Sequence, residues 1–498
     1  MTEGPAIYRW LLSGKVFWTA FILMAALRLY VISQIQLMQD EAYYWVWTRH
    51  LSLSYFDHPP LCSWLIYLST SLLGHTEFAV RLPATILSLA SIPVLMWGAR
   101  AIVSERRIQY LVGNLMLASP ATVVLGILNT PDSPAWFFGC ASIAAACWAA
   151  RTTNRNAGHW ILFGFLLGLA MLSKYTAGLI GPSIFIALLT TPDRRIHLYR
   201  PWFWLAAIIS AIVFSPVLIW NIQHDFPSFR FQLKHGFGGD GNYGILRGLG
   251  EYLGGQLLVW TPLLFVLSAF AAAKAIRRYP TLSGGAHILV CTFLIPFAMF
   301  LYSSTRKRVE INWPLLVYGP LGIITALYVA IGDPGRRRRA IAVGVAIAFI
   351  ASVTLQVPNF LLRLASRFPK ANQLFGNREL AAEVDKVRAG RPVFTNRYQD
   401  AAELTFYLPD HHDVWALNII SRTNVYDYWE GKPDLSKVSS AVFVNFEAHQ
   451  FPKEFAARQT IPVNTVLRGR TVRTDTIVIA DRISDSAGAS SGGKASTP

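Results

Sequence analysis

The chain has 498 residues, of which 53% are hydrophobic and only 15% are charged. Charged residues normally approach a quarter of a soluble domain, and apolar runs of membrane-spanning length recur through the first three quarters of this sequence, which excludes a soluble globular protein. The formal charge of +17 does not indicate nucleic-acid binding, because Lys and Arg lie mostly in short loops between apolar runs. The composition therefore predicts a polytopic membrane protein that contacts no nucleic acid.

Apolar runs predict about eleven membrane-spanning helices. The runs cover residues 16–34, 82–103, 108–128, 134–150, 159–173, 176–191, 202–220, 254–276, 286–303, 314–332 and 340–357. A further run, 61–74, is too short to cross and is expected to lie along the membrane surface. Arg28 interrupts the first run, so we expect a retained helix and no cleaved signal peptide.

The positions of the basic residues predict the orientation of these helices. If the N-terminus is cytoplasmic, every cytoplasmic loop is basic, as the positive-inside rule requires. The opposite loops, including the long segments 35–81 and 221–252, hold the acidic residues. An odd number of crossings then places the C-terminal region on the outer side. The four cysteines lie in or near apolar runs, without the spacing of a zinc site or a disulfide framework; they are Cys62, Cys140, Cys147 and Cys291.

The chain changes character after residue 357. We expect residues 1–357 to form the membrane domain, 358–483 a small α/β domain on the outer side, and 484–498 a disordered tail rich in Ser, Gly and Ala. Within the small domain the pattern predicts helices at 378–388 and 401–407 and strands at 392–395, 441–445 and 476–479. It carries no catalytic motif, and we expect it to bind the acceptor or to cap the cavity.

Two adjacent carboxylates, Asp40 and Glu41, follow the first apolar run and precede Tyr43 and Tyr44. An ionised carboxylate beside hydrocarbon is costly unless it is hydrogen-bonded, paired with a cation or chemically active. A second polar turn, Asp57-His58, is followed by two prolines that hold it rigid. The alternative interpretation is an ordinary polar loop with the aromatic belt that membrane interfaces carry.

Two groups of basic residues on the outer side break the positive-inside pattern. Lys174 and the cluster Arg306-Lys307-Arg308 are suited to binding an anion, most naturally a phosphate. Asp132, Glu310 and Asn312 lie in the same outer turns as further candidate substrate contacts. The alternatives are that Lys174 extends to the interface from a helix end, and that the cluster contacts lipid headgroups.

Carboxylates and a phosphate-binding cluster at a membrane surface together indicate transfer of a group from a lipid phosphate. If the group is a sugar, the leaving phosphate needs positive charge to stabilise it as the bond breaks. The acceptor hydroxyl needs a base, which a nearby carboxylate supplies.

Several segments resemble the C-type glycosyltransferase superfamily, and within it the protein mannosyltransferase-like family (glycosyltransferase family 39) and the bacterial aminoarabinose lipid A transferases. The resemblance covers the eleven apolar runs and also part of the C-terminal region. The segments are Asp40-Glu41, Tyr55-Phe56-Asp57-His58-Pro59-Pro60, Ser173-Lys174-Tyr175-Thr176-Ala177-Gly178, Glu310-Ile311-Asn312-Trp313-Pro314, Asn396-Arg397-Tyr398-Gln399 and Phe406-Tyr407-Leu408-Pro409.

This resemblance implies an inverting transferase in a bacterial inner membrane. It implies a polyprenyl-phosphate-linked sugar donor and an envelope acceptor, such as a lipopolysaccharide precursor, on the periplasmic face. Asp40 matches an essential acidic residue of the family, with Glu41 as its neighbour, and Lys174 matches a basic residue that meets the donor phosphate. Arg306 and Arg308 are its expected partners. Asp57-His58-Pro59 stands where the aminoarabinose enzymes carry Glu-Lys-Pro, so the same substrate contact is not implied there.

The glycine-rich segment 221–252 is expected to be a mobile loop that closes over a lipid-linked substrate, a plain connector being the alternative. His224 and His235 lie eleven residues apart without a third ligand and make a weak metal site. No cofactor is firmly expected, and a divalent metal remains open.

A flippase or transporter of lipid-linked sugars is the alternative function, with the same charges lining a pathway. Transporters commonly show repeated halves and interrupted helices in matching positions, and the sequence shows no such repeat. A polysaccharide polymerase or ligase would share the logic of the site and differ in its donor.

Overall fold

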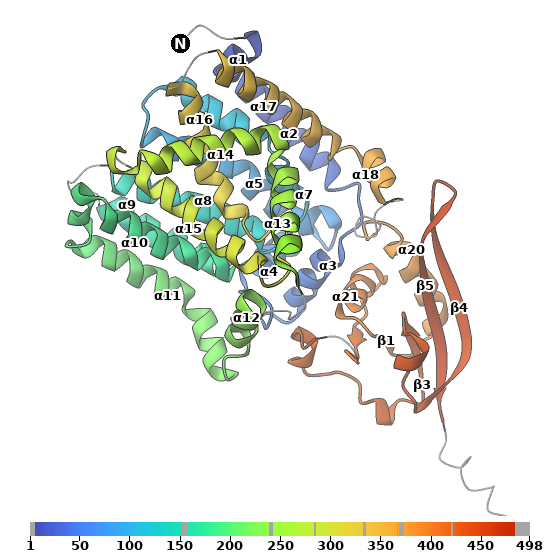
Figure 1. The fold of residues 1–498 in the computed structure, drawn as a ribbon. Coiled ribbons are helices and arrows are strands. Elements are labelled where there is room, and N and C mark those ends of the chain that lie inside the picture. The colour runs from blue at the N-terminus through green and yellow to red at the C-terminus, as the bar shows by residue number, and fades with distance from the viewer. Residues whose placement is uncertain are drawn as a thin grey trace, which may run out of the picture. The chain divides into compact units, whose positions relative to one another are not determined.

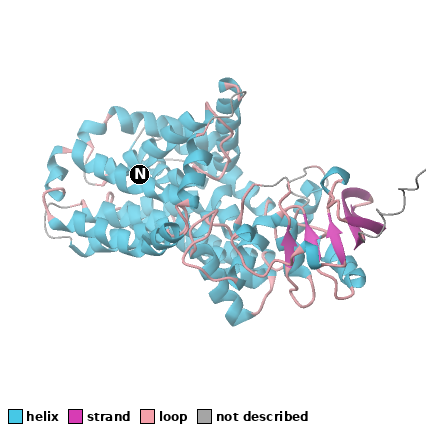
Figure 2. Cartoon of the chain, turned by 90° about the horizontal axis from the view of Figure 1, so that it is seen from below, coloured by secondary structure: helices cyan, strands magenta, loops and turns pink. Residues whose placement is uncertain are grey.

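The computed structural model describes residues 5–151, 157–238, 243–282, 285–331, 335–365, 367, 373–419 and 422–483. The chain divides into two compact units, which we call the helical unit (residues 1–34 and 51–360) and the sheet unit (residues 35–50 and 361–498). Among the described residues every strand belongs to the sheet unit (Figure 2). The expected outer loop 35–81 is thus divided between the two units, and the expected tail 484–498 lies outside the described residues.

Helices build the helical unit, and they form where the apolar runs predict them (Figure 1). Two of the runs are broken, 108–128 at Ser119 and 254–276 at Thr261. The helices are α1 (Ala6–Leu11), α2 (Gly14–Val31), α4 (Leu61–Leu73), α5 (Glu77–Arg100), α6 (Arg106–Ala118), α7 (Pro120–Ile127), α8 (Asp132–Ala149), α9 (Ala157–Met171), α10 (Ile180–Thr190), α11 (Pro201–Gln223), α12 (Pro227–Phe237), α13 (Ile245–Trp260), α14 (Pro262–Arg277), α15 (Ala286–Ser304), α16 (Tyr318–Ile331) and α17 (Arg336–Thr354), followed by α18 (Pro358–Ala365).

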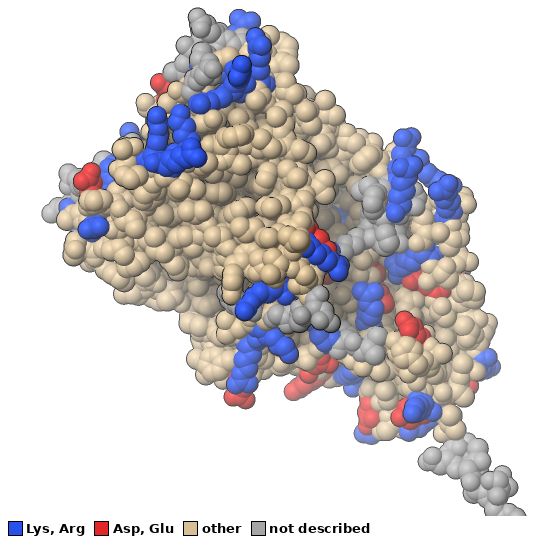
Figure 3. Space-filling view, in the orientation of Figure 1, with Lys and Arg blue, Asp and Glu red and all other residues tan. Residues whose placement is uncertain are grey.

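Four described helices, α2, α5, α11 and α15, are long and apolar enough to cross a membrane, and the bent pairs α6–α7 and α13–α14 raise the number to six if each pair is one span. The pairs are bent by 59° and 105°. Pro120 and Pro262 begin the second helix of each pair, where proline removes a backbone donor and interrupts the preceding helix. Figure 3 shows a broad face of the helical unit with few charged side chains. The chain is a multi-pass membrane protein, and the expected count of eleven spans is not confirmed.

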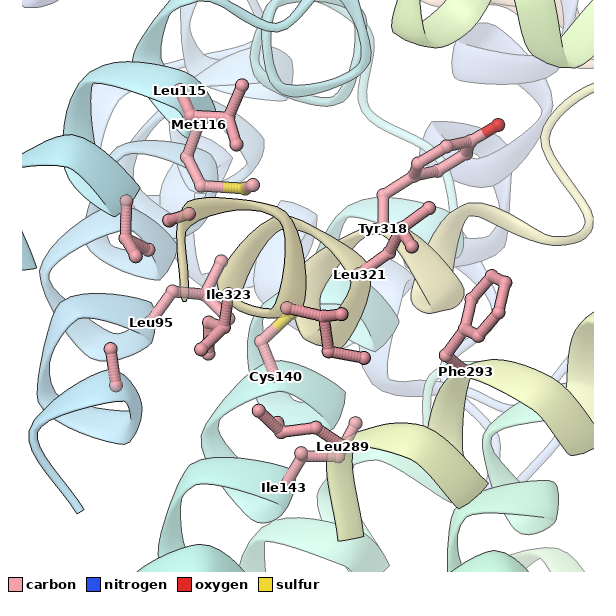
Figure 4. Packing of buried hydrophobic residues seen from close by; sticks show 14 of the residues in the cluster. Leu95, Leu115, Met116, Cys140, Ile143, Leu289, Phe293, Tyr318, Leu321 and Ile323 are labelled. Carbon is pink, nitrogen blue, oxygen red and sulfur yellow. The ribbon is translucent and has the colours of Figure 1, made fainter. Parts of the chain in front are cut away.

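The core of the helical unit is formed by apolar side chains from helices that are far apart in the sequence. Leu321 and Ile323 of α16 belong to one cluster of buried side chains with Met116 of α6 and Cys140 of α8 (Figure 4). These side chains are at most 4% exposed. The four cysteines are buried and form no disulfide bonds among the described residues, so their side chains contribute to the packing.

Two glycines spaced four residues apart allow α9 and α11 to pack closely. A methyl group at Gly164 would overlap the backbone of Ala206, and one at Gly168 would lie 2.5 Å from Cβ of Val213. Small residues at this spacing are a common means by which membrane helices approach one another.

We therefore expect Gly164→Leu to destabilise the protein by about 1–3 kcal/mol, because the added side chain must push the two helices apart. The matched control is Gly158→Leu on the same helix, since a Cβ at Gly158 meets nothing within 4 Å. Thermal unfolding in detergent measures both variants. Equal melting temperatures for the two would contradict this account of the α9–α11 contact.

The sheet unit contains a five-stranded sheet of order β2-β1-β3-β5-β4 in its described residues. β1 pairs in parallel with β2 and β3, and β5 pairs antiparallel with β3 and β4. The elements are β1 (Val393–Thr395), β2 (Val414–Ala416), β3 (Ser440–Val444), β4 (Phe455–Leu467) and β5 (Arg470–Arg482), with helices α20 (Asn377–Arg388) and α21 (Tyr398–Tyr407).

Three of these strands and both helices lie where the sequence predicts them, whereas β2 and β4 were not predicted. β2 has only three residues. β4 is an edge strand with most of its side chains exposed or half-exposed, so it lacks the apolar alternation that marks a half-buried strand.

Candidate functional site

Asp40 and Glu41 lie in the first turn of α3 (Gln39–Val46), which belongs to the sheet unit. Carboxylates are favoured in this turn by the positive end of the helix dipole. Glu41 is completely buried, and its Oε2 accepts a hydrogen bond of 3.0 Å from the backbone N–H of Met38, which closes the helix start. Asp40 is partly exposed. Glu41 is therefore placed to stabilise the start of the helix, whereas Asp40, which is partly exposed, remains the candidate base.

Tyr43 and Tyr44, expected as substrate contacts, are both buried, with 2% and 8% of their surfaces exposed. The Tyr43 hydroxyl accepts a hydrogen bond of 3.0 Å from the backbone N–H of Val425, and its ring centroid lies 4.5 Å from that of Tyr398. The Tyr44 ring meets Trp47 edge-on at 5.0 Å. These contacts favour an anchoring role for both tyrosines within the sheet unit.

In the helical unit, Lys174, Asp132 and Asn312 form one buried polar network. Lys174 Nζ lies 2.6 Å from Asp132 Oδ1, and Asn312 Nδ2 donates to Asp132 Oδ2 at 2.8 Å. Asp132 is the first residue of α8, and Lys174 follows the end of α9. The three residues were predicted as separate site candidates, and in the fold they form one hydrogen-bonded network.

The Lys174 ammonium keeps donors for a further ligand. It carries three hydrogens, and Asp132 is its hydrogen-bond partner among the described residues. Both side chains of the pair are about one-tenth exposed, at 9% for Lys174 and 10% for Asp132. A buried ion pair of this kind adds little stability by itself, and it is strongly destabilising to remove one partner alone.

The segment 305–314 carries the second group of cations together with Asn312. Arg306 and Arg308 are exposed, with the guanidinium of Arg306 5.4 Å from the Tyr302 ring and Arg308 Nε 3.4 Å from Glu310 Oε1. Lys307 is buried, and its Nζ lies 5.9 Å from the Trp313 ring centroid. Asn312 therefore connects the segment that bears these cations to the Lys174 network.

The Asp57-His58 turn is held against helices of the same unit. Asp57 is buried and His58 half-buried, and the Asp57 carbonyl accepts a hydrogen bond of 2.7 Å from Gln232 of α12. The backbone N–H of Leu61 donates to the carbonyl of Leu172 at 3.0 Å, two residues before Lys174. The turn therefore adjoins the chain segment that bears Lys174.

The segment 221–252, which we expected to be a glycine-rich loop, is largely helical in its described residues. α11 continues to Gln223, α12 occupies Pro227–Phe237, and α13 begins at Ile245. Pro227 at the first position of α12 is a common helix-starting signal that the glycine content obscured. Residues 239–242 and the side chain of His235 lie outside the described residues.

His224, which the sequence offers only as a weak candidate metal ligand, contacts its own helix. Its Nδ1 lies 2.8 Å from the Trp220 carbonyl, and the two rings stack at 4.2 Å. Among the residues that the structure describes, no group of three His, Cys, Asp or Glu side chains is placed to hold a metal ion.

Three further residues support the site and were not predicted as site residues. Ser228 and Gln232 of α12 donate hydrogen bonds to the carbonyls of Tyr55 and Asp57. The Trp313 ring faces the ammonium group of Lys307. Trp313 could have been found, because it stands inside the segment that carried the resemblance. Ser228 and Gln232 lie about 175 residues from their partners, and no local pattern indicates such a contact.

The fold of this chain is similar to that of a protein whose crystal structure is known. The crystal structure of ArnT from Cupriavidus metallidurans in the apo state aligns with a TM-score of 0.66 at 16% identity, covering 94% of this chain and 98% of that protein. The structure of the same protein bound to undecaprenyl phosphate aligns with a TM-score of 0.65. The architecture is therefore the ArnT-like C-type glycosyltransferase fold with a small C-terminal sheet.

Sequence comparisons also find similar proteins with known names. Residues 57–220 match the family described as dolichyl-phosphate-mannose-protein mannosyltransferase. Lipid A galacturonosyltransferase RgtD of Rhizobium johnstonii is 26% identical over 373 residues, which are 74% of this chain and 76% of that protein. Undecaprenyl phosphate-alpha-4-amino-4-deoxy-L-arabinose arabinosyl transferase 2 of Proteus mirabilis is 24% identical over 333 residues, 65% of this chain and 59% of that protein. The predicted resemblance is confirmed.

Proposed function

We propose that this chain is an inverting glycosyltransferase that moves a sugar from a polyprenyl-phosphate donor to an envelope glycolipid of the lipid A class. The observation that carries the proposal is the similarity, over 74% of the chain, to a protein named as a lipid A galacturonosyltransferase. A second relative is named for an undecaprenyl-phosphate-linked aminoarabinose. Both names are those of transferases, which favours transfer over the alternative of a flippase or transporter.

In the proposed reaction Asp40 removes the proton from the acceptor hydroxyl as its oxygen attacks the anomeric carbon of the donor sugar. The bond from that carbon to the phosphate oxygen breaks on the opposite face, and the lipid phosphate leaves with the electron pair. One displacement inverts the anomeric configuration. Lys174 and the cations at 306–308 stabilise the negative charge that develops on the leaving phosphate.

In this proposal Asp40 and the cations at Lys174 and 306–308 act on the same donor sugar phosphate on the periplasmic side. The alternating basic loops of the sequence support a cytoplasmic N-terminus and a periplasmic C-terminal region. Asp57, His58 and Glu310 would contact the substrates.

The test is a transfer assay with the purified full-length protein in detergent. Polyprenyl phosphates that carry 4-amino-4-deoxyarabinose or galacturonic acid are the donors, lipid A is the acceptor, and mass spectrometry detects the product. We expect lipid A to gain the mass of one sugar. Transfer in detergent cannot be transport, because no compartment exists. Donor binding without transfer to lipid A or to other envelope glycans would overturn the proposal. A parallel assay with EDTA measures metal dependence.

A further inference from the structure

The sheet unit buries three carboxylates beside α3, the helix that carries Asp40. Asp400 and Glu403 of α21 and Asp475 of β5 are at most 4% exposed. Arg473 lies 2.8 Å from Asp475 through its Nε and 3.8 Å from Glu403 through its Nη2. Buried charges are expensive, and an apolar core is often at least as stable as a buried ionic cluster. Stability alone therefore does not account for these buried charges.

Hydrogen bonds join this carboxylate cluster to residues at the start of α3 and just before it. Gln39, the residue before Asp40, donates from Nε2 to Asp400 Oδ1 at 3.4 Å. Asn377 donates from Nδ2 to Glu403 Oε1 at 3.1 Å and to the carbonyl of Leu37 at 3.2 Å. α3 lies against α21, which carries both carboxylates (Figure 1).

Two further contacts complete this arrangement. Arg473 Nη1 donates a hydrogen bond of 2.7 Å to Asn377 Oδ1. The Asn377 side-chain amide therefore accepts from Arg473 and donates to the backbone carbonyl of Leu37. The Tyr407 hydroxyl, at the end of α21, accepts a hydrogen bond of 2.6 Å from the backbone N–H of Leu37. Both backbone polar groups of Leu37 are thereby fixed by side chains of the sheet unit.

The pKa values of the buried carboxyl groups show how burial and the neighbouring arginines act on this cluster. Burial raises the pKa of the Glu403 carboxyl well above its ordinary value, against the lowering effect of Arg473. Burial also raises the pKa of Asp400, with Arg397 and Arg473 lowering it and Asp475 raising it. Arg473 and Arg397 therefore offset part of the negative charge that the buried carboxylates carry.

We propose that this network, centred on Asn377, Glu403 and Arg473, is the positioning device for Asp40. It fixes residues 37–39 and hence the direction in which the Asp40 side chain leaves the first turn of α3. Misplacement of a catalytic group by about 1 Å costs on the order of 100-fold in rate, which gives such a device a large effect. The inference rests on the proposed function, in which Asp40 is the base. It also gives the sheet unit a role beyond binding the acceptor or capping the cavity.

The test compares Asn377→Ala with Asn464→Ala in the full-length protein. Asn464 is an exposed amide on β4 whose Oδ1 accepts from Thr474, so it serves as the matched control. We expect Asn377→Ala to lower kcat by about 10- to 100-fold with KM unchanged for both substrates. Amide hydrogen exchange should rise in residues 36–46 and stay constant in β5, a readout that does not depend on activity.

Three further variants distinguish a positioning defect from a folding defect. Glu403→Gln keeps the acceptor for Asn377 without the charge and should retain kcat within about threefold, whereas Glu403→Ala should behave like Asn377→Ala. Gln39→Ala removes the hydrogen bonds of Gln39 to this cluster and leaves the contacts between Asn377, Glu403 and Arg473 in place. If Asn377→Ala does not fold, Gln39→Ala takes its place, with a smaller loss of kcat and faster exchange at 36–46.

Unchanged kcat and exchange in both Asn377→Ala and Glu403→Ala would overturn the inference, as would a loss of activity that only follows the loss of folded protein. Asp40→Asn is the reference. If Asp40→Asn is inactive while the network variants are normal, the positioning role alone fails. If Asp40→Asn still transfers sugar, the assignment of the base fails instead.

Discussion

Asp40→Asn is expected to reduce transfer by about 10²–10⁴-fold while the protein remains folded and inserted in the membrane. The amide has almost the shape of the carboxylate but cannot accept the proton of the acceptor hydroxyl. Because Asp40 is partly exposed, its replacement should change stability by no more than about 0.5 kcal/mol. The measurement is single-turnover transfer in detergent, with thermal unfolding of the same sample.

Glu41→Gln is the matched control, because it makes the same chemical change on the neighbouring residue. The Glu41 side chain accepts from the backbone of Met38, and an amide oxygen can still do so, at a cost of about 1 kcal/mol or less. Transfer should therefore persist within about tenfold. An active Asp40→Asn with an inactive Glu41→Gln would reverse the two assignments.

Lys174→Met is expected to abolish transfer and also to destabilise the protein by about 3–5 kcal/mol, since it leaves Asp132 as an uncompensated buried charge. The single variant cannot distinguish a structural lysine from a phosphate-binding one. The double variant Lys174→Met/Asp132→Asn can, because it removes both charges and keeps an acceptor for Asn312. We expect the double variant to recover most of the lost stability.

If Lys174 binds the donor phosphate, the double variant should remain inactive and should bind polyprenyl phosphate at least about tenfold more weakly, as loss of a charge-assisted hydrogen bond implies. Thermal unfolding and a donor-binding assay are the two readouts. Normal transfer by the double variant would show that the ion pair only holds the ends of α8 and α9 together.

The sequence was most informative where the signal is local. Apolar runs predicted most helices of the helical unit, and polar residues between the runs identified Lys174, Asp132 and Asn312 as candidates. Their assembly into one network was not predictable, because Asp132 lies 42 residues from Lys174 and 180 from Asn312. The length of a run likewise does not tell a straight span from one broken at a residue such as Thr261.

The sequence was least informative about α3 and its surroundings. Asp40 was recognised as a candidate base, but its segment was placed with the membrane domain. The hydrogen bond from Gln39 to Asp400 spans 361 residues, and no periodicity or turn signal carries that information. Asp400, Glu403 and Asp475 lie in ordinary-looking helix and strand segments, so only the burial in the folded chain distinguishes them from surface carboxylates.

The central claim is that Asp40 and the cations around Lys174 act on one sugar phosphate from opposite sides. The most direct test is an electron cryomicroscopy structure of the Asp40→Asn variant with a polyprenyl-phosphate-linked sugar bound. The claim predicts the phosphate within about 3–4 Å of Lys174 or of the cations at 306–308, and the side chain at position 40 facing the anomeric carbon from the other side. A phosphate bound away from these cations, or a side chain at position 40 directed into lipid or open solvent, would contradict it.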